Sequence, residues 1–346
     1  MFKMRHTLST LLILLVLSSC ATKNKPVVKR GMYYWESKNN YLSDAEENLI
    51  KESDISKLYL KLFEVEYDEE LGAVPISKTN LSRHSEFEKR EIIPCVYIQN
   101  TVFTRMDKYE LEDFVENTLY LVTKMLKDDL YIEAKPKEIQ IDCDWTPSTK
   151  ENYFLFLKSL KAKTSSKISC TLRLYPYKYH DKMGIPPVDR VMLMCYNLLS
   201  PKNNENKNSI FDLNEFEKYT DSKVNYPLPM DYALPKYSWN ICYENKSFKG
   251  VIHGPQSVLQ PHLKNINSLW SILQTDTVID NIYLRRGFRI KHESVSNKTL
   301  EKLIDQLKKN SSFDDTITVS FFQLDEKEFK ITPHEELDNL YRRFSK

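Results

Sequence analysis

Glycine is scarce in this chain of 346 residues, occurring only six times. The six glycines form no G-x-G-x-x-G or Walker-type loop, so nucleotide fingerprints are absent and we expect no cofactor. An excess of charge of one sign is also lacking, because 50 Lys and Arg stand against 48 Asp and Glu. This balance argues against a nucleic-acid partner, since such proteins usually carry a basic surplus on one face.

Closely spaced cysteine pairs are missing as well. Apart from Cys20, no C-x-x-C pair occurs among the cysteines, which are Cys95, Cys143, Cys170, Cys195 and Cys242. Four of these five lie in apolar, strand-like runs, where a cysteine behaves as a small buried hydrophobe. We therefore expect neither a disulfide framework nor a zinc or other metal site.

A long hydrophobic run occurs only near the N-terminus. Lys3 and Arg5 precede an apolar stretch over residues 8–17, which is too short to span a membrane and is typical of a secretory signal. Leu17-Ser18-Ser19-Cys20 follows and resembles the bacterial lipoprotein box, whose cysteine is acylated after cleavage. A plain signal peptide with a chance cysteine is the alternative.

The lipoprotein interpretation divides the chain into a signal peptide (1–19), a polar tether (20–30) and a single barrel domain (31–346). Cleavage would remove two cations and leave 327 residues without net charge. A lipid such as palmitate on Cys20 would then hold the protein to the membrane. We expect a monomer in the cell envelope, on the periplasmic side or the outer-membrane surface.

Strand-like apolar runs alternate with amphipathic helical segments from residue 31 onward, which is typical of βα units. The pattern predicts eight strands: Met32–Glu36, Lys57–Val65, Glu91–Asn100, Glu138–Trp145, Lys167–Tyr177, Arg190–Leu199, Tyr232–Tyr243 and Asn281–Arg289. This rhythm favours an α/β fold, a (β/α)8 TIM-like barrel, over an open doubly wound sheet. An extra strand at Thr316–Leu324 and a helix are expected after the barrel.

The fourth predicted strand carries the most informative motif, E-I-Q-I-D-C-D-W-T from Glu138 to Thr146. Because side chains alternate along a strand, Ile139, Ile141 and Cys143 share one face. Asp142 and Asp144 share the other face and would point into the barrel near the carboxyl end of the strand. Barrel enzymes place their catalytic groups at that end.

Two basic residues, Lys61 and Arg173, are expected to share this interior. Burying charges costs several kcal/mol unless they pair, so ion pairs with the acids are expected. These pairs either fix the register of the strands or belong to a cleft in which one acid raises the pKa of the other. For Asp142 and Asp144 the position at the end of the strand favours the functional interpretation.

The I-Q-I-D-C-D-W run resembles the fourth-strand motif D-x-x-D-x-D-x-E of family 18, chitinase-type glycoside hydrolases. Asp142 and Asp144 match its second and third acids, but Thr146 stands where the family has its proton-donating glutamate. The segment Met194–Asn197 is similar to the sixth-strand M-x-Y-D/N, which implies a catalytic role for Tyr196. The segment Leu234–Trp239 is similar to P-x-Y-G followed by a sugar-stacking tryptophan.

The chain also resembles a bacterial, often lipid-anchored family of unknown function. The shared pieces are the Q-x-D-x-D strand, the following Y-x-x-F-L helix, A-L-P-x-Y and a late R-R-G at Arg285–Gly287. That resemblance implies a barrel related to glycoside hydrolases and assigns no reaction.

These patterns leave three classes of function open: a glycoside hydrolase, a carbohydrate-binding protein and a structural envelope protein. An enzyme would need a replacement for the missing acid, and the candidates are Glu36, Glu64 and Glu293. Sugar binding would use aromatic rings, although such residues are often simply core. The predicted glycan-binding residues are Trp35, Glu36, Arg173, Tyr175, Tyr237, Trp239 and Arg286.

Overall fold

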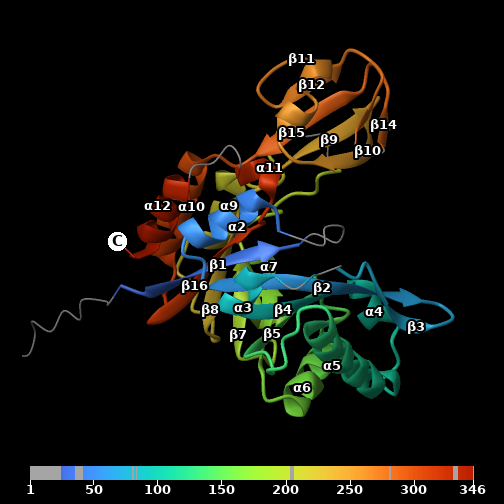
Figure 1. Cartoon of the computed structure of the whole chain (residues 1–346), viewed down its shortest axis with the longest axis vertical. Helices are drawn as coiled ribbons and strands as arrows, with labels where there is room; N and C mark the ends of the chain where they lie inside the picture. The colour runs from blue at the N-terminus through green and yellow to red at the C-terminus, as the bar shows by residue number, and fades with distance from the viewer. Residues whose placement is uncertain are drawn as a thin grey trace, which may run out of the picture.

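The protein folds around a closed barrel of eight parallel strands (Figure 1). The structure is a computed structural model that describes residues 25–35, 42–79, 82, 84–202, 206–279, 282–329 and 334–345. The barrel strands, in their spatial order, are β1 (Val27–Tyr34), β2 (Lys57–Asp68), β4 (Glu91–Ile98), β5 (Glu138–Asp142), β6 (Lys167–Leu172), β7 (Arg190–Met194), β8 (Met230–Pro235) and β16 (Thr316–Phe322). Strand β16 pairs with β1 and closes the barrel, which confirms the predicted fold class.

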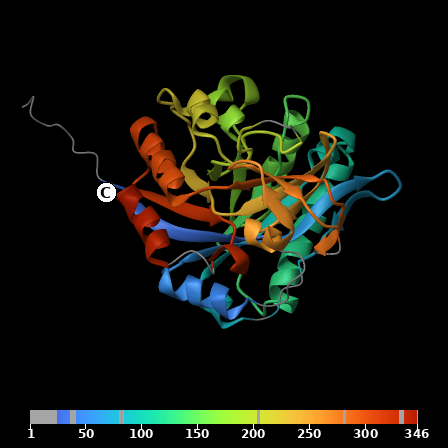
Figure 2. The same ribbon diagram turned by 90° about the horizontal axis from the view of Figure 1, so that it is seen from above.

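Helices surround the strands, as the view from above shows (Figure 2). They are α2 (Asp44–Glu52), α3 (Ser85–Lys89), α4 (Asn100–Arg105), α5 (Glu110–Asp128), α6 (Lys150–Lys163), α7 (Leu174–Lys178), α8 (His180–Met183), α9 (Leu213–Thr220), α10 (Asn297–Asn310), α11 (Glu326–Phe329) and α12 (His334–Ser345). Helix α5 buries the stripe that its sequence predicts, including Phe114, Val122 and Leu126. Helix α10 begins at Ser296, whose side chain accepts a hydrogen bond from the backbone of Thr299. None of the helices in the described ranges is long and apolar enough to cross a membrane.

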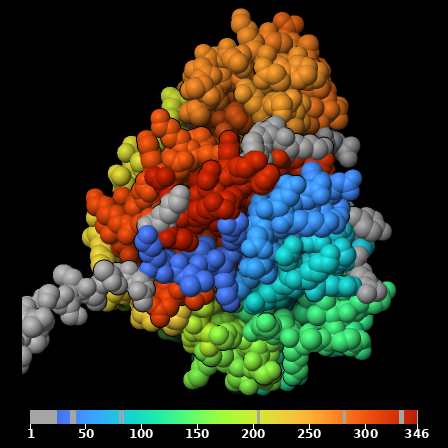
Figure 3. All heavy atoms as spheres, turned by 60° about the vertical axis from the view of Figure 1, so that its left-hand side comes forward, coloured from blue at the N-terminus to red at the C-terminus, as the bar shows by residue number. Residues whose placement is uncertain are grey.

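A second, antiparallel sheet is inserted between β8 and α10 and stands as a lobe beside the barrel (Figure 3). Its strands are β9 (Ser238–Glu244), β10 (Ser247–His253), β11 (Leu263–Asn265), β12 (Trp270–Leu273) and β15 (Arg289–Ser294). A two-stranded hairpin of β13 (Thr277–Ile279) and β14 (Ile282–Leu284) completes the lobe. On the other side, β3 (Gly72–Ile76) extends β2 as an antiparallel hairpin.

The inserted sheet changes the assignment of the last barrel strand. Residues 282–289, predicted as the eighth barrel strand, belong to the insertion, so that prediction is wrong. The predicted extra strand near the C-terminus is β16, which lies between β8 and β1 in the barrel. The predicted strand Tyr232–Tyr243 is also divided, because the chain leaves the barrel after Pro235 and enters the insertion at Ser238.

The predicted faces of the barrel strands are confirmed. Ile139, Ile141 and Cys143 are all buried, while the opposite face of the strand, which points into the barrel, carries polar groups. Near the amino end of the barrel, Ser169 donates to Glu138 at 2.6 Å and Arg190 forms two 2.7 Å hydrogen bonds with Asp231. These contacts pair the interior charges, as burial requires. The carboxyl end, opposite them, holds Asp142.

Candidate functional site

Asp142 lies at the last position of β5, facing the mouth of the barrel. The hydroxyl of Thr171 donates a 2.5 Å hydrogen bond to its Oδ1. Burial raises the pKa of Asp142 to about 7, and the negative charge of Asp144 contributes in the same direction. Near neutral pH the carboxyl group therefore exists in both protonated and ionised forms, which suits a group that donates and recovers protons.

Asp144 lies beyond the end of the strand and is more open to solvent. Its carboxylate forms a 2.7 Å ion pair with Nη1 of Arg173, and the Nη2 of Arg173 donates to the backbone oxygen of Asn197 at 2.8 Å. Because both side chains of the pair are about 40% exposed, the pair adds little to stability. Its effect is to connect the segments that follow β5, β6 and β7.

Asn197 is a site residue that the predicted set missed, although the M-x-Y-N segment contains it. Its backbone is left-handed, with φ of 54°, a conformation that asparagine tolerates better than most residues. Its Oδ1 accepts a 2.6 Å hydrogen bond from the hydroxyl of Tyr237. Asn197 thus joins Arg173, through its backbone, to Tyr237, through its side chain.

Aromatic rings form the inner wall of the mouth. Phe322, at the end of β16, stacks on Tyr196 with ring centres 5.0 Å apart and contacts Trp35 and Tyr237 at 5.7 and 5.6 Å. Burial raises the pKa of both tyrosines, so their hydroxyls stay protonated. Phe322 was not predicted because its strand had not been assigned to the barrel.

Lys61 and Glu64 continue the rim on the other side of Asp142. The Nζ of Lys61 lies 2.6 Å from the Glu64 carboxylate and 5.8 Å from the ring centre of Trp35. Arg173 therefore pairs with one of the two expected acids, Asp144, whereas Lys61 pairs with Glu64 and with neither Asp142 nor Asp144. Asp142 is therefore surrounded by one rim of side chains, which runs from Glu64 through Trp35, Tyr237 and Arg173 to Asp144.

A cavity of about 350 Å³ opens beside the Asp144–Arg173 pair. The segments after β5, β6 and β7 line it with Trp145, Thr146, Leu174, Tyr175, Met183, Tyr196 and Tyr219, among others. Tyr175 lies on α7 and not on a strand as predicted, and about half of its surface is exposed. Mostly apolar walls with a few convergent polar groups are typical of small-molecule sites. Within the described ranges, no group of three or more metal-ligating side chains was found.

Thr146 stands where the chitinase-type motif has its acid, and its hydroxyl is engaged locally. It lies 2.9 Å from the hydroxyl of Ser148 and 3.2 Å from that of Thr149, just before α6. A threonine hydroxyl is no proton donor of useful acidity, so this position supplies no general acid.

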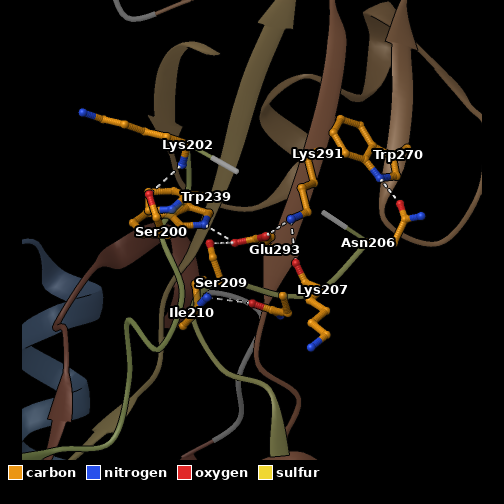
Figure 4. Close-up of polar contacts among 12 residues, drawn as sticks. Ser200, Lys202, Asn206, Lys207, Ser209, Ile210, Trp239, Trp270, Lys291 and Glu293 are labelled. Carbon is orange, nitrogen blue, oxygen red and sulfur yellow. Dashed lines mark hydrogen bonds and ion pairs between the residues drawn. The ribbon is translucent and has the colours of Figure 1, made fainter. Parts of the chain in front are cut away.

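Glu293, a candidate for the missing acid, is enclosed between the insertion and the segment after β7 (Figure 4). Its carboxylate forms a 2.7 Å ion pair with Lys291 and accepts hydrogen bonds from Trp239 Nε1, at 2.7 Å, and from Ser209. Because none of its surface is exposed, it has no access to a substrate. The contact does orient Trp239, whose ring packs edge-on against Tyr237.

The remaining predicted residues lie elsewhere. Arg286 is exposed in the turn between β14 and β15, at the end of β15 away from the barrel, so the structure does not bring it to the mouth. Glu36 and Cys20 lie outside the described residues.

Comparisons with solved structures find the same barrel fold in other proteins. No family model and no curated protein sequence matches the chain. The structure is similar to the spore cortex-lytic enzyme SleL of Bacillus cereus, with a TM-score of 0.55 and 14% identity over 93% of this chain and 75% of that one. It is also similar to a chitinase of Chromobacterium violaceum, with a TM-score of 0.50 and 9% identity over 91% and 98% of the two chains. At such identities the likeness concerns the fold.

Proposed function

We propose that this protein binds a glycan at the mouth of the barrel and hydrolyses one of its glycosidic bonds, with Asp142 as the proton donor. The observation that carries the proposal is the half-buried Asp142 carboxyl group at the mouth of the barrel, which has a pKa of about 7, accepts a hydrogen bond from Thr171 and lies among the aromatic rings of the mouth. Glycoside hydrolysis requires such an acid at the leaving oxygen. Aromatic rings contact the apolar faces of sugars, while Arg173 offers donors to hydroxyl groups.

A second candidate function is glycan binding without turnover. The observation that favours it is Thr146, whose hydroxyl is held by Ser148 and Thr149 at the position of the chitinase-type acid. The rim would then bind the sugar through Arg173 and the tyrosines, and Asp142 would act only as a hydrogen-bonding group.

The test is a panel of glycans chosen with the spore cortex-lytic enzyme and the chitinase in mind, because these two structures resemble this one. Purified protein is incubated with peptidoglycan, chitin and soluble chito-oligosaccharides, and both released reducing ends and bound protein are measured. We expect turnover that Asp142→Ala and Asp144→Ala abolish, with circular dichroism showing a retained fold. Binding without turnover would select the second candidate, and neither binding nor turnover would contradict both.

We also propose that the protein is held in the cell envelope by a lipid on Cys20. The supporting pattern is the basic start, the apolar stretch and the small residues before this cysteine. In a bacterial host, we expect the wild type in the membrane fraction and a mass increase from acyl chains on the N-terminal peptide. Cys20→Ser should be released or retain its leader. An unmodified Cys20 in the wild type would refute the anchor.

A further inference from the structure

Glu64 and Asp142 lie in one row across the barrel wall. On β2, Glu64 is paired in register with Tyr97 of β4, and Tyr97 is paired in turn with Asp142 of β5. Two interstrand spacings separate the two acids, which amounts to about 10 Å between strand axes. Side chains reaching inward from this row approach each other. Both carboxylates accordingly contribute to raising the pKa of the Tyr97 phenol, to about 12, although burial is the largest cause.

The surroundings of Glu64 differ from those of Asp142. The Glu64 side chain is 22% exposed, so water reaches it, and the buried Lys61 lies 2.6 Å from its carboxylate. The positive charge of Lys61 stabilises a negative charge on Glu64. Asp142 instead accepts a hydrogen bond from the neutral hydroxyl of Thr171. The pair therefore combines a solvent-accessible carboxylate beside a cation with a carboxyl group that can carry a proton.

The other acids near the mouth do not offer this combination. Asp144 follows Asp142 by two residues in the same segment, so it stands on the same side of the mouth as the proposed acid, and Glu293 is enclosed by Lys291, Ser209 and Trp239. Of these acids, Glu64 is the one that lies on a different strand from Asp142, in the same row, and is partly open to solvent. The acids of inverting glycosidases stand about 6.5–9.5 Å apart, which leaves room for a water molecule between base and sugar.

We propose that Glu64 is the general base of an inverting hydrolysis in which Asp142 is the general acid, an inference that rests on the function proposed above. The bond between the anomeric carbon and the leaving oxygen breaks, and the proton of Asp142 passes to that oxygen. A water oxygen forms the new bond to the anomeric carbon and gives its proton to Glu64. One water is consumed, and solvent then returns the proton from Glu64 to Asp142.

Glu64→Gln tests this role, with Glu66→Gln as the matched control. Glu66 lies on the same strand and pairs with β3, beyond the last residue that pairs with β4. On the glycan that the wild type cleaves in the panel above, we expect Glu64→Gln to lower kcat by about 10²–10⁴-fold and Glu66→Gln to change it less than twofold. Proton NMR of the first product should show the inverted anomer. Azide should restore turnover to Glu64→Ala by forming a glycosyl azide of inverted configuration.

Glu64→Asp covers the case in which Glu64→Gln fails to fold because Lys61 loses its partner. The shorter acid keeps the charge but moves the base by more than 1 Å, so kcat should fall by about 10²-fold without loss of the fold. A wild type that turns over, together with an unaffected Glu64→Gln or a retained anomer, would overturn the role of Glu64 and leave the proposed hydrolysis standing. A wild type that cleaves none of the glycans would overturn the hydrolysis itself, and the role of Glu64 with it.

Discussion

Asp142→Asn is expected to raise the free energy of unfolding by about 2–4 kcal/mol at pH 8, while leaving it nearly unchanged at pH 4. Asparagine has the same shape as the neutral acid and keeps an oxygen for the hydrogen bond from Thr171. It carries no charge, so the folded protein no longer holds a carboxylate in a buried position. The same substitution should remove turnover, because the proton donor is gone.

The sign of this change in the free energy of unfolding follows from the direction in which the pKa of Asp142 is shifted. Burial raises the pKa of Asp142 from its ordinary value of 3.8 to about 7, so the folded state binds the proton more tightly than the unfolded chain does. The corresponding stability is fully present below pH 4 and is lost as the pH rises through about 7. A shift of this size corresponds to about 4 kcal/mol, and the opening of the site toward solvent reduces the expected effect.

Urea unfolding of the wild type and Asp142→Asn between pH 4 and pH 8 measures this effect. Asp144→Asn is the control, because Asp144 is 46% exposed and its loss should change stability by less than about 1 kcal/mol at either pH. Parallel pH profiles for the wild type and Asp142→Asn would show that Asp142 titrates normally. The proton-donor role would then lose its physical basis.

Glu293→Gln is expected to lower the free energy of unfolding by about 3–5 kcal/mol. Glutamine can still accept the hydrogen bonds from Trp239 and Ser209, so the packing is largely kept. Lys291, however, is 1% exposed and would retain a charge without its carboxylate, because its other contacts, the backbone oxygen of Lys207 and the ring of Trp270, carry no net charge. An uncompensated buried charge costs far more than a lost hydrogen bond.

A double variant separates the charge from the packing. Adding Lys291→Met to Glu293→Gln removes the unpaired cation and should recover at least half of the lost stability. Glu244→Gln, which breaks the solvent-accessible pairs with Lys249 and Arg285, should cost much less than Glu293→Gln. If Glu293→Gln costs no more than Glu244→Gln, the enclosed pair is not under the electrostatic constraint described here. Chemical denaturation at pH 7 measures all three variants.

Much of the barrel was predictable because its signals are local. Alternation along Glu138–Asp142 separates the apolar face of Ile139 and Ile141 from the polar face, and the sequence of α5 shows the apolar stripe that the helix buries. The prediction of the eighth barrel strand was wrong for a physical reason. Residues 282–289 and Thr316–Phe322 both show strand-like patterns. Thr316–Phe322 joins the barrel by pairing with β8 and β1, which lie far away along the chain, whereas residues 282–289 are divided between the β13–β14 hairpin and β15.

The residues of the site also divide into those with a local sequence signal and those that depend on distant contacts. Asp142, Asp144, Arg173 and Tyr196 were expected at the mouth, because strand ends in a barrel converge there. Asn197 and Phe322 act through contacts with residues far away along the chain, such as the hydrogen bonds that Asn197 accepts from Arg173 and Tyr237, 24 and 40 positions away. The insertion that separates Arg286 from the mouth could not be recognised from local pattern either, since its strands resemble those of the barrel.

The inserted sheet begins and ends at the same place, since Ser238 of β9 is paired with Ser294 of β15. Paired antiparallel residues lie about 5 Å apart, so a short turn could join them and skip the whole insertion. The lobe is therefore a unit whose two chain connections to the barrel lie side by side. The lobe is also hydrogen-bonded to the segment after β7. Tyr243 and Lys291 donate to the backbone oxygens of Pro201 and Lys207, and Glu293 accepts a hydrogen bond from Ser209. If the lobe were replaced by another of the same fold, the segment after β7 would lose these hydrogen bonds. A chimeric protein should therefore exchange the lobe and this segment together.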